Sequence, residues 1–572
     1  ARHSFNTNAS NLDLRQSAFL AGLVKNPTGY DPTNSPDAAL ERRNVVLARM
    51  AQLNVISHQK AAQAEKTRLG LHVIPAKNGC LNSRAPFFCD YAINWLLHDP
   101  RLGETVEERK KLLKSGGLII HTTIDLADQA AADQAVRDHV AQRDQAVGAL
   151  AMVEPGTGAV KALAQSRPMG RDEADGQTFL NYTVPTEYGD SAGFQAGSTF
   201  KPFVLAAAVN EGVPLSTTFN APQTMTIPQD EFENCPDAGN FAGEWTVSSS
   251  TSSGSMDIYR GTRESVNTFY AMLERVTGVC EPFNIARKLG VQLTDPTGDS
   301  HGYGAERVPT FTLGIANASP LEMAEAYATF GARGLHCDSH PVTSIDDAQG
   351  NEIRAYENSC QQALPQATAD AVNDVLRGVQ EPGGFGYDLG GTGLSVPSAG
   401  KTGTTQDGKS VWFVGYTPQI ATAAMIAGAS KDGQRPIPLA GQTIHGTYIY
   451  SVTGSGFAGP MWAEAMHVVD DRLKYEDFTA PSATAVQGVP TTVPSVSGMS
   501  VDTAMSTLSG AGFKPIQGGT VNSTYGAGTV AYTSPSGGSS APSGSVITIY
   551  ESNGIAPAPP PSPPGNGGGH GG

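Results

Sequence analysis

Three serine and lysine pairs with a spacing of three residues are the first groups in this sequence that could do covalent chemistry. The pattern S-x-x-K occurs at Ser57 to Lys60, Ser198 to Lys201 and Ser398 to Lys401. On a helix, residues three apart lie on the same side, so the lysine amine can reach the serine hydroxyl and accept its proton. A serine activated in this way attacks carbonyl groups. Because both residue types are common, the pattern alone indicates little in a chain of 572 residues.

Two further elements follow the second of these pairs. S-x-N occurs at Ser4 to Asn6 and at Ser265 to Asn267, and K-T-G occurs once, at Lys401 to Gly403. The order S-x-x-K, S-x-N, K-T-G is typical of enzymes that form an acyl ester on serine. Only Ser57 or Ser198 can head that order, with Ser265 and Lys401 completing it.

The local sequence decides between Ser57 and Ser198. Ser57 precedes the charged stretch HQKAAQAEK, so we predict that it caps the N-terminus of a surface helix. Ser198 follows Gly197 at the start of a predicted helix over 199–209, whose phenylalanine, valine and alanine residues share one apolar face. We therefore predict that Ser198 is the nucleophile.

The remaining polar residues of the set have roles that suit acyl transfer. Lys201 is the predicted base, provided that burial and a cationic neighbour lower its pKa, and Lys401 is the candidate neighbour. Ser265 offers a hydroxyl for proton relay. Asn267 offers an amide that can hold a substrate peptide or Lys201.

The K-T-G element is predicted to be a strand that binds substrate. Gly403 lacks a Cβ, so an extended substrate can lie against it, while Lys401, Thr402 and Thr404 offer a charge and hydroxyls to a terminal carboxylate. The backbone N–H groups of Ser198 and Thr404 are the predicted oxyanion hole.

Composition excludes several other functions. The chain has 38 Lys and Arg against 54 Asp and Glu, a formal charge of -16, which does not favour nucleic acid as a partner. Its six cysteines match no zinc spacing and no HExxH occurs, so we expect no metal and no cofactor.

The cysteines lie in three local pairs, Cys80 with Cys89, Cys235 with Cys280 and Cys337 with Cys360. Three disulfides and an exported location are the favoured interpretation, and six reduced cysteines in the core are the alternative.

Hydrophobic patterning predicts the elements that must position these residues. Helices are expected near 12–24 and 39–53, at 125–136 and from 318, with a strand over 118–123. A hairpin around Pro155, together with strands at 411–416 and 420–428 and a covering helix from Pro460, predicts a central sheet. The fold class is therefore α/β (α+β).

Four segments resemble the transpeptidase domain of class A, bifunctional penicillin-binding proteins. They are QAGSTFKPF at 195–203, RESVNTFYAML at 263–273, ASPLEMAEAYATFGARG at 318–334 and AGKTGTTQDGKSVWFVGYTP at 399–418. One departure is Ala196, where the family usually has Pro. The resemblance implies a central antiparallel sheet flanked by helices over 147–477. It also implies a D,D-transpeptidase that crosslinks peptidoglycan stem peptides and is acylated by β-lactam antibiotics.

The flanking regions resemble parts of the same family. Residues 1–55 are similar to the end of a glycosyltransferase domain, and 56–146 to the linker region that follows it. Because the catalytic glutamates of that domain would lie upstream, we expect this chain to have no glycosyltransferase activity. The resemblance implies a membrane-anchored protein on the extracytoplasmic face, with the anchor missing from this chain.

The C-terminal part resembles a single PASTA domain over 493–553, preceded by a linker over 478–492 and followed by a Pro/Gly-rich tail over 554–572 that we expect to be disordered. This combination suggests an actinobacterial, mycobacterial-type protein. PASTA domains imply muropeptide or β-lactam binding, and a spacer is the alternative. For the whole chain, a non-catalytic wall-binding scaffold or sensor and a D,D-carboxypeptidase remain the alternative functions.

Overall fold

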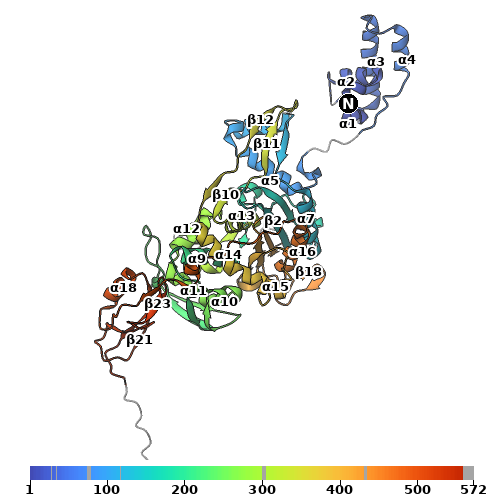
Figure 1. The fold of residues 1–572 in the computed structure, drawn as a ribbon. Helices are drawn as coiled ribbons and strands as arrows, with labels where there is room; N and C mark the ends of the chain where they lie inside the picture. Colours follow the sequence, from blue (N-terminus) through green and yellow to red (C-terminus); the bar gives the residue numbers. More distant parts are fainter. Residues whose placement is uncertain are drawn as a thin grey trace, which may run out of the picture. The chain divides into compact units, whose positions relative to one another are not determined.

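The structure is a computed structural model that describes residues 1–27, 29–33, 35–73, 79–115, 117–298, 304–430 and 435–557 (Figure 1). The chain divides into two units, Ala1–Ser83 and Arg84–Gly572. The predicted disordered tail lies outside the described residues from residue 558 onward. Within the described residues, no helix is both long and apolar enough to span a membrane.

The first unit is helical, as the sequence predicted. Its helices are α1 (Arg2–Phe5), α2 (Leu14–Leu23), α3 (Pro36–Gln52) and α4 (His58–Glu65), with the short 3-10 turns η1 (Ala9–Asn11) and η2 (Cys80–Asn82). Ser57 Oγ accepts a hydrogen bond from the backbone N–H of Lys60 at 3.2 Å, which caps α4. The prediction that Ser57 is a helix cap is confirmed.

The second unit is built on a six-stranded sheet. Five strands follow one another in the spatial order β14 (Ala399–Thr404), β15 (Ser410–Tyr416), β16 (Ala421–Ala429), β2 (Ala146–Val153) and β3 (Val160–Gln165), and β17 (Pro436–Ile437) pairs with β16. All of these pairings are antiparallel. The central antiparallel sheet is confirmed, and β14 forms one of its edges.

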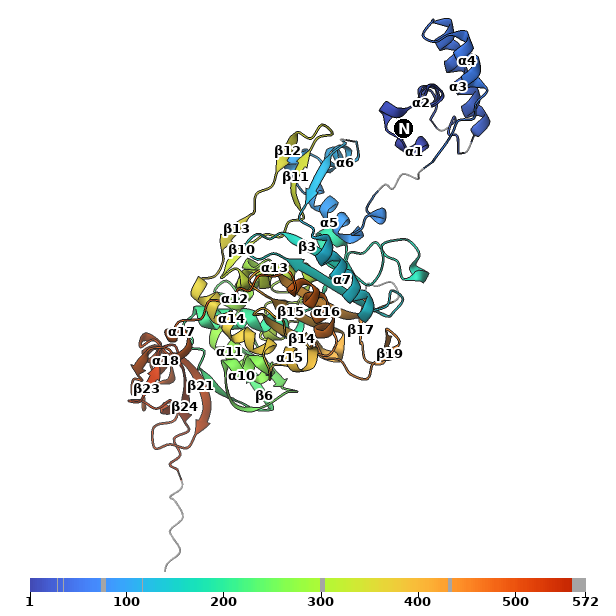
Figure 2. The ribbon, with the colours of Figure 1, turned by 45° about the vertical axis from the view of Figure 1, so that its right-hand side comes forward.

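Helices cover both faces of this sheet. Alternate residues of β2 point to opposite sides, so Val147 and Ala149 join one core while Leu150 and Met152 join the other. Helices α7 (Leu126–His139) and α16 (Ala458–Asp470) pack against each other on the second face (Figure 2). Helices α13 (Pro320–Gly331) and α14 (Gln366–Gln380) pack on the first face, the side on which the serine and lysine motifs lie.

Helix α9 (Lys201–Asn210) and five further helices complete this region. They are α8 (Thr186–Gly189), α10 (Ile258–Arg263), α11 (Asn267–Thr277), α12 (Cys280–Lys288) and α15 (Phe385–Gly390), with the 3-10 turns η4 (Glu173–Asp175), η5 (Gly197–Phe200), η6 (Gln229–Glu231), η7 (Phe311–Leu313) and η8 (Gln406–Gly408).

Five two-stranded ladders connect these helices. They are β4 (Phe194–Gln195) with β9 (Asn317–Ala318), β5 (Thr218–Ala221) with β8 (Gly254–Asp257), β6 (Thr224–Pro228) with β7 (Glu244–Ser248), β10 (Leu335–Cys337) with β13 (Cys360–Gln362), and β18 (Thr443–Ile444) with β19 (Thr447–Tyr448). The sequence analysis did not predict these short strands.

The region before the sheet contains α5 (Pro86–Leu97), the turn η3 (Pro100–Leu102), α6 (Val106–Ser115) and β1 (Ile119–Thr122). The strand predicted over 118–123 is confirmed as β1. It pairs with β11 (Val342–Asp346), which pairs in turn with β12 (Glu352–Ala355). A segment expected to be a linker thus forms a sheet with residues more than 200 positions later in the sequence.

The cysteines are oxidised. Disulfides join Cys235 to Cys280 and Cys337 to Cys360, as predicted, and Cys80 and Cys89 are disulfide-bonded as well. The alternative of reduced cysteines in the core is wrong for this structure.

The C-terminal part has its own small core. It contains α17 (Ala483–Gln487), β20 (Pro490–Thr492), α18 (Val501–Gly510), β21 (Lys514–Val521), β22 (Val530–Ser534), β23 (Ser540–Pro542) and β24 (Val546–Ser552). The strand order is β21, β24, β22, and α18 packs on β21 and β24. The predicted helix over 501–510 and the strands near 529–533 and 545–550 are confirmed, whereas β21 was not predicted.

Candidate active site

The predicted nucleophile lies in a tight turn that begins a helix. Ser198 is the second residue of η5, which runs directly into α9 at Lys201. Gly197 has a φ of +63°, and a Cβ on it would come within 2.9 Å of the Thr404 backbone nitrogen. Glycine is therefore required here both by the backbone conformation and by the close approach of β14.

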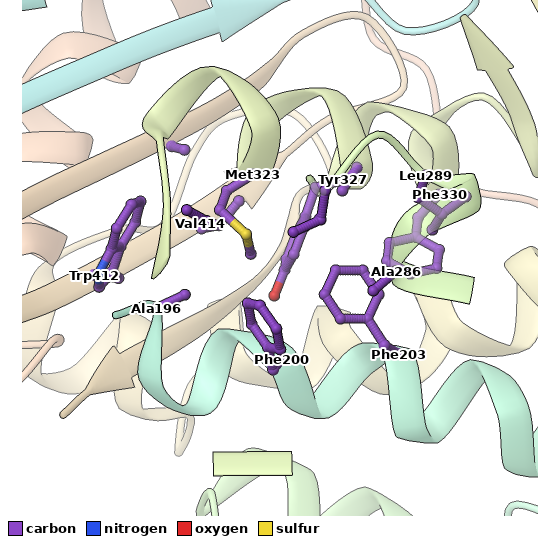
Figure 3. Close-up of a cluster of buried hydrophobic side chains, with 14 of the residues drawn as sticks. Ala196, Phe200, Phe203, Ala286, Leu289, Met323, Tyr327, Phe330, Trp412 and Val414 are labelled. Atoms are coloured by element: carbon purple, nitrogen blue, oxygen red, sulfur yellow. The ribbon is translucent and has the colours of Figure 1, made fainter. Parts of the chain in front are cut away.

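Aromatic side chains pack between this turn and α13. Phe200 and Phe203 are buried against α13, and the Tyr327 hydroxyl donates a hydrogen bond to the Thr199 carbonyl oxygen at 2.8 Å (Figure 3). The Thr199 hydroxyl donates to the Ala196 carbonyl oxygen at 2.8 Å. The backbone around Ser198 is thus fixed by its neighbours. The Ser198 side chain itself is half-buried and makes no hydrogen bond to any residue that the structure describes.

Lys201 points into a closed set of acceptors. Its side chain is fully buried, and Nζ lies 2.7 Å from the Ser265 carbonyl oxygen, 2.8 Å from Asn267 Oδ1 and 3.1 Å from Ser265 Oγ. Nζ also lies 5.3 Å from the centre of the Tyr270 ring. S-x-x-K and S-x-N, which lie more than 60 residues apart in sequence, therefore meet at one amine.

Burial, reinforced by the nearby charge of Lys401, holds the pKa of Lys201 well below its ordinary value. A neutral lysine has two N–H donors and one lone pair. The Ser265 carbonyl and Asn267 Oδ1 can only accept, so they use both donors. The lone pair of the amine then remains for a hydroxyl proton, which is the state that a general base requires.

Ser265 adopts an uncommon backbone conformation. Its φ is +51°, in the left-handed region that is unfavourable for residues other than glycine. It follows α10 and precedes α11, and its backbone N–H donates to the Thr262 carbonyl oxygen at 3.1 Å. This turn presents both the carbonyl and the hydroxyl of Ser265 to Lys201. Strain of this kind is concentrated at functional sites.

Lys401 lies on the other side of the same hydroxyl. Its side chain is fully buried on β14, and Nζ lies 2.7 Å from Ser265 Oγ and 3.1 Å from the Thr402 carbonyl oxygen. Burial lowers the pKa of Lys401 to about 7. Because no carboxylate contacts Nζ within the described residues, an anionic ligand would find this charge uncompensated.

The K-T-G strand lies directly against the nucleophile turn. A Cβ on Gly403 would come within 2.5 Å of the Ala196 carbonyl oxygen and 2.9 Å of Thr199 Cγ2. Thr402 is buried, whereas Thr404 is exposed and its Oγ1 accepts a hydrogen bond from the Gly454 N–H at 3.0 Å. The absence of a side chain at Gly403 is what lets β14 approach Ser198.

The structure thus brings together every residue that the sequence singled out. Lys201, Ser265, Asn267 and Lys401 form one hydrogen-bonded network, and Ser198 lies on the turn against which Gly403 and Thr404 pack. The groups around both lysines are hydroxyls, carbonyls and an amide, a set that lacks the imidazole, thiolate or carboxylate ligands of a metal.

Three further residues support the site and were not foreseen. The Ser248 carbonyl accepts a hydrogen bond from Asn267 Nδ2 at 3.1 Å, Tyr270 lies beside Lys201, and Tyr327 holds the Thr199 carbonyl. Tyr270 follows Asn267 by three residues on α11, so its position on the same face was readable from the spacing. The contribution of Ser248 depends on the path of β7 and has no local signal.

Comparison with known proteins finds three family matches along the chain. The family model described as the penicillin binding protein transpeptidase domain matches residues 148–445, slightly more than half of the chain. A PASTA domain model matches residues 491–553, and a transglycosylase model matches residues 1–51.

Curated relatives are similar over most of this chain. Penicillin-binding protein 1A of Mycobacterium tuberculosis is 28% identical over 506 residues, covering 85% of this chain and 55% of the relative. Penicillin-binding protein 1A of Mycolicibacterium smegmatis is 27% identical over 498 residues, covering 84% and 57%. The chain therefore spans a little over half the length of these relatives.

Solved structures of penicillin-binding proteins are also similar to this chain. The PonA1 protein from Mycobacterium tuberculosis in complex with penicillin V has a TM-score of 0.53 and 26% identity, covering 69% of this chain and 96% of that chain. Penicillin-binding protein 1A from Haemophilus influenzae has a TM-score of 0.61 at 17% identity, covering 86% of this chain and 85% of that one, a likeness of fold alone.

Proposed function

The chain belongs to the class A penicillin-binding proteins, and from that membership we propose that it is a D,D-transpeptidase that crosslinks peptidoglycan stem peptides through an acyl-enzyme on Ser198. The observation that carries this proposal is the network in which Lys201 and Lys401 meet at Ser265 Oγ beside the nucleophile turn. A buried neutral amine three residues after a half-buried serine suits that serine to acylation.

The first half of the reaction forms the acyl-enzyme. Ser198 Oγ attacks the carbonyl carbon of the penultimate D-Ala, and its proton passes to Lys201, directly or through the Ser265 hydroxyl. The resulting oxyanion is stabilised by the backbone N–H groups of Ser198 and Thr404. The bond to the terminal D-Ala then breaks, the leaving amine takes the proton from Lys201, and an ester on Ser198 remains.

The second half resolves this ester. The amine of a neighbouring stem peptide attacks the ester carbon and gives up a proton, and the new amide leaves while Ser198 Oγ regains its proton. Atoms and charge balance with no cofactor. A β-lactam follows the first half only, because its leaving amine stays tethered in the opened ring and blocks the acceptor.

Substrate recognition falls to the K-T-G strand. The Lys401 charge and the Thr402 and Thr404 hydroxyls would bind the terminal carboxylate of the stem peptide, as they would the carboxylate of a penicillin. Because β14 is an edge strand of the described sheet, an extended peptide can pair with its free side. Asn267 would hold Lys201 or the peptide backbone.

The wider biology is also part of the proposal. We assign 147–477 to the transpeptidase domain and 493–553 to the PASTA domain, with 1–55 as part of a glycosyltransferase domain and 56–146 and 478–492 as connecting regions. The protein would act on the extracytoplasmic face of the membrane, where its stem-peptide substrates are. The PASTA domain would bring muropeptides to the same surface.

Two alternatives make different predictions. A D,D-carboxypeptidase would use the same residues with water as the acceptor. A non-catalytic scaffold acting through the PASTA domain would leave Ser198 unreactive. The completeness of the lysine and serine network disfavours the scaffold.

A stem-peptide assay distinguishes the three. The chain is incubated with a synthetic peptide ending in D-Ala-D-Ala, with and without an added D-amino acid as acceptor, and D-Ala release and the peptide products are measured. The proposal predicts acceptor-dependent formation of a new peptide bond. If D-Ala is released but the acceptor is never incorporated, the chain is a carboxypeptidase. If D-Ala is not released and the chain does not bind penicillin covalently either, the chain is a scaffold.

A further inference from the structure

A second cluster of polar side chains lies away from Ser198, on the opposite side of α13. It contains Glu325 on α13, His336 on β10, and Asp338 directly after β10. His336 Nε2 lies 3.4 Å from Glu325 Oε1 and 3.4 Å from Asp338 Oδ1. One ligand atom from each of the three residues lies within 4.8 Å of both others. His336 is buried, Glu325 is largely buried, and Asp338 is exposed.

These separations match the edges of a metal coordination polyhedron. Zinc binds histidine nitrogen and carboxylate oxygen at about 2.0–2.2 Å, which places tetrahedral ligand atoms about 3.3–3.6 Å apart. Both nitrogen-to-oxygen distances fall in this interval. Two of the three edges of the cluster therefore have the spacing of a ligand set, and the third, between the two carboxylates, is no longer than 4.8 Å.

Each residue of the cluster is also fixed through the atom that would not bind metal. His336 Nδ1 hydrogen-bonds Thr329 Oγ1 at 3.1 Å, which leaves Nε2 facing Glu325 and Asp338. Glu325 Oε2 accepts from the Ser339 N–H at 3.1 Å, and Asp338 Oδ2 accepts from the Ser359 hydroxyl at 2.7 Å. Partners of this kind orient the ligands in known metal sites.

The cluster lies at the wall of a cavity of about 680 Å³. The residues that line the cavity include one arginine, Arg101, and five carboxylates. The carboxylates are Glu187, Glu322, Glu325, Asp338 and Glu357. Gly290 also lines it, with a φ of +94°, and a Cβ there would lie 2.2 Å from Glu325 Oε1. The glycine keeps that oxygen accessible, and the excess of carboxylates favours a cation in this cavity.

We propose that Glu325 Oε1, His336 Nε2 and Asp338 Oδ1 bind a divalent transition-metal ion of the zinc type, with water from the cavity as the fourth ligand. One histidine and two carboxylates are a donor set that suits such an ion. The ion would fasten the β10–β13 hairpin, which the Cys337–Cys360 disulfide closes, to α13. The role of the ion would be structural. It would fix the position of α13, and the other face of α13 carries Tyr327, which hydrogen-bonds the nucleophile turn.

No sequence motif indicated this site. His336 follows Glu325 by eleven positions and Asp338 follows His336 by two, a spacing that matches no metal motif. The expectation of no metal was based on such motifs. The alternative to a metal is a direct contact of His336 with both carboxylates, and the two differ in whether the cluster takes up an ion.

Metal titration of the full chain tests the proposal. The protein, stripped with a chelator, is titrated with ZnCl2 by calorimetry and with CoCl2 by visible absorption. We expect one equivalent of tight binding, the intense visible bands of four-coordinate Co²⁺, and a zinc-dependent rise in Tm. Loss of an orienting partner alone lowers metal affinity by about 10- to 100-fold. Ser359 is such a partner, so Ser359→Ala should raise the Kd for Zn²⁺ by about tenfold. Asp338 is itself a ligand, so Asp338→Asn should raise the Kd by at least about 10- to 100-fold.

A second histidine and aspartate pair supplies the matched control. His121 Nε2 lies 2.8 Å from Asp346 Oδ2, and the metal-ligand grouping around His336 has no counterpart there. Asp346→Asn should leave zinc affinity unchanged. Binding that survives both Asp338→Asn and Ser359→Ala would place the ion elsewhere and overturn the proposal. No saturable uptake by the parent chain would overturn it as well and would favour the bridging histidine.

Discussion

Lys201 and Lys401 both lie within hydrogen-bond distance of a single hydroxyl, with their Nζ atoms 3.1 and 2.7 Å from Ser265 Oγ. Burial lowers the pKa of both lysines, and the nearby charge of Lys401 lowers that of Lys201 further. The arrangement therefore favours one charged and one neutral lysine. The neutral amine suits the residue next to the nucleophile, Lys201, and the charge suits the residue on the substrate strand, Lys401.

The first prediction concerns pH. Because the pKa of Lys401 is about 7 in the free protein, its charge is present below pH 7 and is lost as the pH rises through that value. The second-order rate constant for acylation by a penicillin, which carries a carboxylate, should fall above pH 7 and report this free-enzyme pKa. Stopped-flow or quenched labelling across pH 5 to about 9 measures it.

The matching variants are Lys401→Met and Lys409→Met. Lys401→Met should lower the rate at pH 6 by about 100-fold and remove the alkaline decline. Lys409 lies just before β15 and its side chain is 41% exposed, so Lys409→Met should keep the parental profile. An unchanged alkaline decline in Lys401→Met would show that another group titrates.

The second prediction concerns Asn267→Asp, which keeps the size of the side chain and adds a negative charge. Asn267 Oδ1 lies 2.8 Å from Lys201 Nζ, so a carboxylate there stabilises the protonated amine and raises the pKa of Lys201. The acid limb of the acylation profile should move to higher pH, and the rate at pH 7 should drop. Asn267→Ala adds no charge and should not shift that limb in the same direction.

The third prediction separates the strain at Ser265 from its chemistry. Both Ser265→Ala and Ser265→Gly remove the shared hydroxyl, so both should lower the acylation rate by about 100-fold. With a φ of +51°, this position favours glycine. The Gly variant should be more stable than the Ala variant by about 1 kcal/mol. Denaturant unfolding measures the difference, and equal stabilities would contradict the strained backbone.

The fourth prediction concerns the approach of β14 to the nucleophile turn. Gly403→Ala introduces a Cβ that would lie 2.5 Å from the Ala196 carbonyl oxygen, so the strand or the turn must move. We expect a loss of stability of about 1–3 kcal/mol and a fall in the acylation rate. Gly239→Ala is the control, since a Cβ there meets nothing within 4 Å. Equal effects of the two substitutions would count against the close approach.

Local sequence patterns predicted several of the longer elements but not how they pair. The helix expected over 501–510 is α18, and the strands expected at 411–416 and 420–428 are β15 and β16. Nothing in the sequence indicated that β16 pairs with β2, where Ala427 faces Val147. Every residue of both strands is buried, so no alternation of polar and apolar residues distinguishes the register.

The sequence likewise predicted part of the candidate site, namely the residues that carry the chemistry, but not the contacts that position them. The ordered motifs identified Ser198, Lys201, Ser265, Asn267 and Lys401, because their chemistry depends on residue type and spacing. The left-handed backbone of Ser265 and the contact of Ser248 with Asn267 depend on how α10, α11 and β7 meet, which no motif encodes. The Glu325, His336 and Asp338 cluster was missed for the same reason.

Covalent labelling with fluorescent penicillin tests the central claim most directly. The parent chain, Ser198→Ala and Ser57→Ala are labelled under identical conditions, and the labelled peptide is identified by mass spectrometry. Ser57 heads another S-x-x-K pattern but caps α4, so it is the matched control. Our account predicts one label per chain on the peptide that contains Ser198, full labelling of Ser57→Ala and none of Ser198→Ala. An unlabelled parent, or undiminished label on Ser198→Ala, would contradict it.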